Sequence, residues 1–137
     1  MTQPPRAPAV SADIALHCDD QQGRPMAFIA TFSYDPHDPF AVVVTFHVPA
    51  GDIPWTIARS LLTQGLAEPC GEGDVRLRPA VDEDGRAVVR MDFHSPEGRL
   101  RAGVRTGELL SFLRRTWLAV APGEESIDLD SLVAALR

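Results

Sequence analysis

The chain has 137 residues, a formal net charge of −6 and a hydrophobic fraction of 45%. This length is typical of one domain with its own core and is too short for two. The acidic balance, with a pI of about 5.1, argues against a nucleic-acid-binding protein, because such proteins normally carry a basic surface. With only two cysteines, a framework of several disulfides is excluded.

The first residues are rich in proline, at positions 4, 5 and 8. We therefore expect a flexible tail over residues 1–12 and a single domain over residues 13–137. The tail has no apolar run of the kind found in secretory signals. The longest apolar stretch without a charged residue, Phe40–Gly51, is too short to span a bilayer. These features predict a cytoplasmic protein.

Three strands and a helix are predicted in the first half of the domain. Asp13–Cys18 alternates apolar and polar residues, Met26–Tyr34 is rich in aromatic and β-branched residues, and Phe40–Val48 is apolar on both faces. A helix is predicted from Trp55 to about Gln64, because apolar residues cover about half of its helical wheel. Gly65 is expected to end this helix as a left-handed C-cap.

The second half repeats this organisation. Alternating residues predict three more strands at Asp74–Val81, Arg86–His94 and Arg99–Val104, and the Asp-Gly pair of Asp82–Gly85 is typical of a hairpin turn. A helix is predicted from Thr106, as its N-cap, to about Leu118.

A short last helix is predicted after Asp128, which would cap it. Its apolar residues follow helical spacing: Leu129, Leu132, Val133 and Leu136. The predicted order is βββα–βββα–α. Because most strands are joined by hairpins, the fold class is α+β with a mostly antiparallel sheet.

No arrangement of residues points to catalysis, and no metal or cofactor is expected. The chain has no glycine loop before a helix, no nucleophile elbow and no metal-ligand spacing. His17 and Cys18 are neighbours on a strand, so they face opposite sides and cannot act as base and nucleophile. Cys18 is expected to pack as a small apolar side chain. Asp35 and Asp38 are expected to cap a turn, and Asp82–Asp84 to lie at a solvated hairpin tip.

Arginines gather on the strands of the second half: Arg76, Arg78, Arg90, Arg99, Arg101 and Arg105. They could line one face of the sheet as a groove for anions or for single-stranded nucleic acid. No aromatic residue alternates with them, although stacking aromatics are typical of single-strand binding. We therefore favour a solvent-facing sheet surface or salt bridges between subunits.

One candidate contact region lies after the second predicted helix. Pro122–Glu125 separates two amphipathic segments. This loop should lie on the surface, because a buried loop would leave backbone groups unpaired. Arg114 and Arg115 belong to the polar face of the helix before it. Glu124 and Glu125 have no basic residue within one helical turn in the sequence, so their charges would be free to face a partner. The alternative is that they only make the loop soluble.

A series of short motifs resembles the SsgA-like proteins of actinobacteria, in order and with similar spacing from about Asp13 to the C-terminus. The matching residues are Phe32–Asp35, Asp38–Val42, Thr45–His47, Trp55, Ala58–Arg59, Leu61–Leu62, Gly65–Leu66, Gly71–Arg76, Ser95–Gly98, Phe112–Thr116, Pro122–Glu124 and Asp128–Asp130. The chain departs from the family pattern in its proline-rich leader, its arginine-rich sixth strand and Trp117.

This resemblance implies a non-enzymatic regulator of sporulation-specific cell division that works without a cofactor at the cell septum. It would act either in placing the septum and recruiting the tubulin-like division protein or in septal and spore maturation. Its implied partners are the tubulin-like division protein and other SsgA-like proteins. The resemblance also implies a fold like that of the Whirly proteins and a homotrimer. The two-sided apolar pattern of Phe40–Val48 likewise favours an oligomer. The alternative function is a Whirly-like single-stranded nucleic-acid-binding protein, which the acidic pI disfavours.

Overall fold

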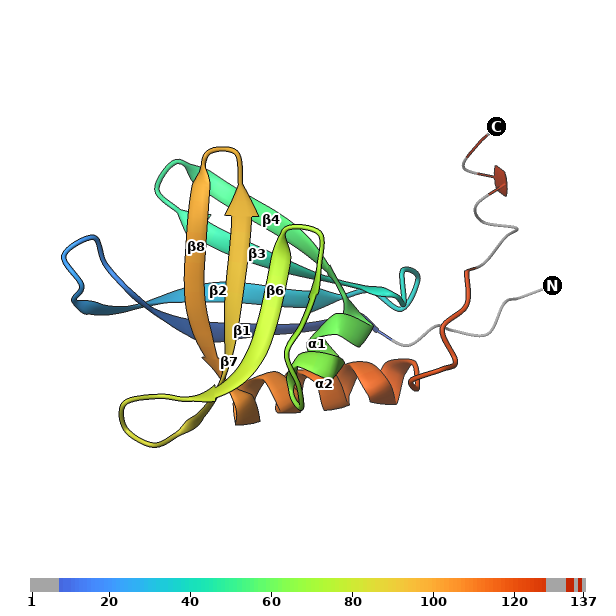
Figure 1. Cartoon of the computed structure of the whole chain (residues 1–137). Helices are drawn as coiled ribbons and strands as arrows, with labels where there is room; N and C mark the ends of the chain where they lie inside the picture. Colours follow the sequence, from blue (N-terminus) through green and yellow to red (C-terminus); the bar gives the residue numbers. More distant parts are fainter. Residues whose placement is uncertain (1–7, 128–132, 135, 137) are drawn as a thin grey trace.

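The computed structural model describes residues 8–127, 133–134 and 136. Within them, the chain forms one eight-stranded sheet and two helices (Figure 1). The elements are, in chain order, β1 Val10–Asp19, β2 Pro25–Tyr34, β3 Ala41–Val48, β4 Gly51–Ala58, α1 Arg59–Gly65, β5 Cys70–Glu72, β6 Val75–Val81, β7 Ala87–Ser95, β8 Gly98–Arg105 and α2 Thr106–Ala119. The predicted α+β class with an antiparallel sheet is confirmed.

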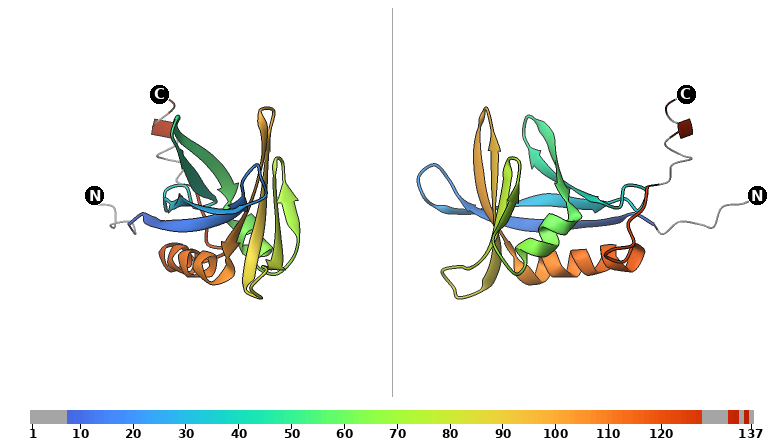
Figure 2. Two further views of the ribbon diagram at one scale, coloured as in Figure 1. Left: turned by 90° about the vertical axis from the view of Figure 1, so that its left-hand side faces the viewer. Right: turned by 45° about the vertical axis from the view of Figure 1, so that its right-hand side comes forward.

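The sheet consists of two halves, β1 to β4 and β5 to β8, which cross each other. The strand order is β4-β3-β2-β1-β8-β7-β6-β5, and every neighbouring pair is antiparallel. The halves meet where β1 pairs with β8, through Leu16 opposite Val104 and His17 opposite Gly103. Beyond this junction β1 and β8 diverge, and α2 runs along β1 (Figure 2).

The core fills the space between the two halves and α2. Aromatic rings bridge the elements edge to face, with Phe46 and Trp55 of one half both 5.2 Å from the ring of Phe93 in the other. Phe32 of β2 packs against Phe112 of α2 at 5.7 Å. Trp117 is half-buried against the same core. The two halves and α2 therefore form one packed unit.

The prediction of a helix from Trp55 is wrong for its first four residues. Residues 51–58 form β4, which pairs with β3 along its whole length. Trp55 and Ile57 face inward, opposite Val44 and Val42 of β3. These apolar residues therefore alternate along a strand and do not form the apolar side of a helix. Pro54 is tolerated because β4 is an edge strand with one unpaired side. Only Arg59–Gly65 is helical.

The predicted role of Gly65 is also wrong. Gly65 lies within α1 without a positive φ, and Leu66 is the C-cap. Gly65 is required for its small size and not for its backbone conformation, because a Cβ at this position would lie 2.9 Å from Cβ of Leu77. The glycine therefore lets α1 pack closely on β6. β5, a strand of only three residues, is not predicted by the residue pattern.

Other boundaries differ by a few residues. β1 begins at Val10, whose side chain is buried, so the ordered sheet starts inside the expected tail. Arg105, not Thr106, is the N-cap of α2, and it makes no side-chain capping bond. The hairpin turn predicted at Asp82–Gly85 is confirmed, since Asp82 Oδ1 accepts the backbone N–H groups of Asp84 and Arg86. Residues 1–7 and most of the helix predicted after Asp128 lie outside the described residues.

Candidate interaction surfaces

A buried arginine joins the start of α1 to the end of α2. The side chain of Arg59 is 2% exposed and lies over the ring of Tyr34, 4.9 Å from its centroid. Its Nη1 donates hydrogen bonds to the backbone oxygens of Thr116 at 3.2 Å and Val120 at 2.7 Å. These carbonyls end a helix whose dipole is negative there, so the guanidinium stabilises the end of α2.

Glu125 completes this arrangement. Its Oε1 accepts a hydrogen bond from Nη2 of Arg59 at 2.6 Å, and its Oε2 accepts one from the backbone N–H of Gly123 at 2.8 Å. The bond from Arg59 holds the pKa of the Glu125 carboxyl below its usual value. The expectation that Glu125 carries a free charge is therefore wrong. The two residues are 66 positions apart, so the sequence carried no local signal of the pair.

The four predicted contact residues lie apart in the fold. Arg115 donates a hydrogen bond of 3.0 Å to the backbone oxygen of Ser11 and so links α2 to β1. Arg114 and Glu124 are exposed and make no ion pair with any residue that the structure describes. The fold therefore uses Arg115 and Glu125, and leaves Arg114 and Glu124 in solvent.

Five of the predicted arginines lie exposed on the outer surface of β6, β7 and β8: Arg76, Arg78, Arg90, Arg99 and Arg101. Asp92 lies among them, directly opposite Arg76 and Arg101 in the pairing. Both carboxylate oxygens of Asp92 accept hydrogen bonds from Arg99. These bonds, with the nearby charges of His94 and Arg101, lower the pKa of Asp92 to about 2. One carboxylate thus balances part of this arginine-rich face.

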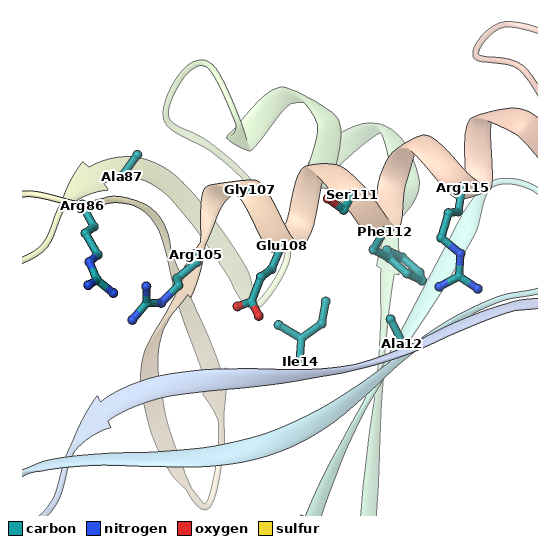
Figure 3. A pocket seen from close by; sticks show the side chains of 10 residues that line it. All are labelled: Ala12, Ile14, Arg86, Ala87, Arg105, Gly107, Glu108, Ser111, Phe112 and Arg115. Carbon is teal, nitrogen blue, oxygen red and sulfur yellow. The ribbon is translucent and has the colours of Figure 1, made fainter.

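The sixth arginine, Arg105, lines an open groove instead. The groove has a volume of about 520 Å³ and lies between β1 and the first two-thirds of α2 (Figure 3). Its apolar lining includes Ala12 and Ile14 of β1 and Phe112 of α2. Its charged lining consists of Arg86, Arg105, Arg115 and Glu108. Sequence reasoning did not find this groove, because α2 and β1 are distant in the chain.

A short polar chain crosses the outer face of β1 to β4. The Thr31 hydroxyl donates to Oδ1 of Asp13 and lies 2.7 Å from Nε2 of His47, whose Nδ1 is 2.8 Å from Oδ1 of Asp52. His47 therefore has partners for both ring nitrogens, as expected for a structural histidine. These groups lie on an exposed face and do not line the groove.

The cysteines play no visible part in a site. Both are free and half-buried, and burial raises the pKa of each thiol. Among the described residues, no three histidine, cysteine or acidic side chains are grouped so that they could hold a metal ion. In the same part of the chain, no helix has the length and apolar character needed to cross a membrane.

Comparison with known families decides the assignment. Residues 28–125 match the model of a family described as "Streptomyces sporulation and cell division protein, SsgA". The chain belongs to the SsgA family. It is 40% identical over 134 residues to the sporulation-specific cell division protein SsgB of Frankia casuarinae, covering 96% of this chain and 93% of the relative. It is 44% identical over 104 residues to SsgB of Streptomyces coelicolor, covering 74% and 75% of the two chains.

Solved structures of SsgA-family proteins share this fold. One comes from work on mutations in SsgB of Streptomyces coelicolor that correlate with longitudinal cell division during sporulation. It matches with a TM-score of 0.80 at 38% identity and covers 86% of this chain and 93% of its own. The other is an SsgA-like sporulation-specific cell division protein of Thermobifida fusca, with a TM-score of 0.84 at 30% identity over 98% and 100% of the two chains. The curled antiparallel sheet is thus the fold of the SsgA family.

Proposed function

We propose that this chain is a non-enzymatic regulator of sporulation-specific cell division that acts through protein–protein contacts. The observation that carries the proposal is the similarity to SsgB over nearly the whole chain, at 40% identity across 134 residues. The groove beside α2 supports it, because it is a charged surface open to a macromolecular partner.

The finer part of the proposal concerns partners and place. The chain acts at the septum, contacts the tubulin-like division protein and other SsgA-like proteins, and assembles as a homotrimer. Arg114 and Glu124 are the predicted contact residues that remain available, since both are exposed. A Whirly-like topology and independence from cofactors remain predictions of the same proposal.

The cellular test is deletion of the gene in its sporulating host, followed by complementation with a fluorescent fusion. We expect loss of regular sporulation septa on deletion, their return on complementation, and fluorescence at the septa. Normal septation in the deletion strain would contradict the proposed function.

The contact residues are tested in vitro by reversing their charges. We expect Arg114→Glu and Glu124→Lys to weaken binding to the purified tubulin-like division protein while the melting temperature stays unchanged. Glu83→Lys, at the exposed tip of the β6–β7 hairpin, is the matched control and should bind as the wild type does. Equal binding by all three variants would remove Arg114 and Glu124 from the contact surface.

A further inference from the structure

One edge of β1 is open where the two halves of the sheet diverge. β2 pairs with β1 along its whole length, but β8 reaches β1 only at Leu16 and His17 within the described residues. Arg115 donates to the backbone oxygen of Ser11 from α2, so the backbone groups of Ser11 point away from β2. The backbone groups of successive residues point to alternate edges of a strand, so the backbone groups of Asp13, two residues further on, also point away from β2. Arg115 occupies the backbone oxygen of Ser11, so the edge open to an added strand is centred on Asp13, which has no strand neighbour on that side among the described residues.

This open edge borders the groove beside α2. Ala12 and Ile14, from the same stretch of β1, line the groove together with Phe112 (Figure 3). A strand edge next to a helix is the arrangement in which an extended peptide adds to a sheet, with main-chain hydrogen bonds on one side and side-chain contacts on the other. The groove volume of about 520 Å³ lies within the range of about 300–1,000 Å³ that is usual for ligand sites.

The charges of the groove indicate what kind of peptide fits. Arg86 and Arg105 lie at one end and Arg115 lies toward the other, with Glu108 between them (Figure 3). Three cations and one anion make the groove positive in a chain whose net charge is −6. Arg115 can keep its bond to Ser11 and still bind a carboxylate, because a guanidinium carries five N–H groups.

The distance along α2 sets the length of the segment. Gly107 and Arg115 both line the groove, and their separation along the helix is about 12 Å at about 1.5 Å per residue. An extended chain covers this distance with about four residues at about 3.3 Å each. A segment with two acidic side chains about four positions apart therefore spans the groove along α2 and presents both acids on one face.

We propose that this groove binds an extended, acidic peptide segment of a partner protein, which adds as a strand to the open edge of β1. The inference rests on the proposed function, because it assigns a surface to the protein–protein contacts. The segment lies over the floor of the groove, where Ala12 is half-buried and Ile14 and Phe112 are almost fully buried, and its terminal carboxylates bind the arginines at the two ends. Charge complementarity between the three arginines and the carboxylates favours an acidic segment as the occupant.

Binding is measured by fluorescence anisotropy on the full chain with a defined probe. The probe is a fluorescein-labelled peptide that is blocked at both termini and alternates valine and threonine between two aspartates. A peptide with lysine in place of each aspartate tests charge. A version with alternate amides N-methylated along the edge that faces β1 tests main-chain pairing. We expect the aspartate peptide to bind and each control peptide to bind about tenfold more weakly or not at all.

Charge reversals in the protein locate the site. We expect Arg86→Glu and Arg115→Glu each to weaken binding of the aspartate peptide about tenfold or more. The matched control is Arg90→Glu, on the outer face of β7, which should bind as the wild type does. Because Arg115 also contacts β1, the melting temperature of each variant is measured, and Arg86→Glu carries the conclusion if Arg115→Glu unfolds.

Several results would overturn the inference. No binding of the aspartate peptide, equal binding of the N-methylated peptide, or equal losses in Arg86→Glu and Arg90→Glu would each do so. A change of oligomeric state in Arg86→Glu would show instead that a second copy of the chain covers the groove. All of these leave the proposed function untouched, since that function fails only if deletion of the gene leaves sporulation septa normal.

Discussion

At the scale of single residues, loss of the Arg59 side chain should strongly destabilise the fold. Arg59 is 2% exposed while its guanidinium donates hydrogen bonds to Thr116, Val120 and Glu125. Arg59→Met keeps most of the volume but leaves these acceptors without their donor. We expect the free energy of unfolding to fall by about 3 kcal/mol in denaturant titrations.

The matched control is Arg90→Met, which makes the same change on the exposed face of β7. It should alter stability by no more than about 0.5 kcal/mol. Equal stability of the two variants would mean that Arg59 does not hold the end of α2. That result would also remove the reason for the ordered contact of Glu125.

Asp92 should make stability depend on pH in the acid range. Its pKa is lowered from 3.8 to about 2, first by the hydrogen bonds from Arg99 and then by the charges of His94 and Arg101. A carboxyl whose pKa is lower in the folded state stabilises the fold above its unfolded pKa, and this stabilisation is lost as pH falls through the folded value. We expect Asp92→Asn to melt at a lower temperature than the wild type at pH 7. The difference should shrink between about pH 4 and about pH 2, and a constant difference across that range would contradict the assignment.

At the scale of elements, α1 is short and depends on the core rather than on its own propensity. Leu62 is fully buried on its inner side, and seven residues form no stable helix alone. We expect Leu62→Ala to lower the free energy of unfolding by about 2–5 kcal/mol. Leu118→Ala, at a position 88% exposed on α2, should cost far less, and similar losses in both variants would mean that α1 does not pack as described.

Among the elements, those formed by neighbouring residues can be predicted from local sequence, and those that depend on distant segments cannot. Hairpins such as β6–β7 follow from neighbouring residues, since Asp82 and Gly85 make the turn and alternation makes the strands. β4 was mistaken for helix because its inner residues also fit a helical wheel, and only pairing with β3 separates the two. The Arg59–Glu125 pair and the groove depend on contacts between segments far apart in the chain. Arg114 and Glu124, the proposed contact residues, could be placed on the surface from sequence, but sequence could not join them to a site.

At the scale of the whole molecule, the last prediction concerns assembly. β2 and β4 expose large apolar side chains, with Ile29 at 49% and Ile53 at 47%, and β4 is an edge of the sheet. Exposed apolar groups near an unpaired strand edge favour association of subunits. We expect light scattering at micromolar concentration to give a mass of about three times the 14.9 kDa of one chain. Ile53→Glu should shift this mass toward one chain because it places a charge at the apolar edge of the sheet, whereas Leu118→Glu on α2 should leave it unchanged. A monomeric wild type would contradict the trimer, and a shift in Leu118→Glu alone would move the interface from the sheet to α2.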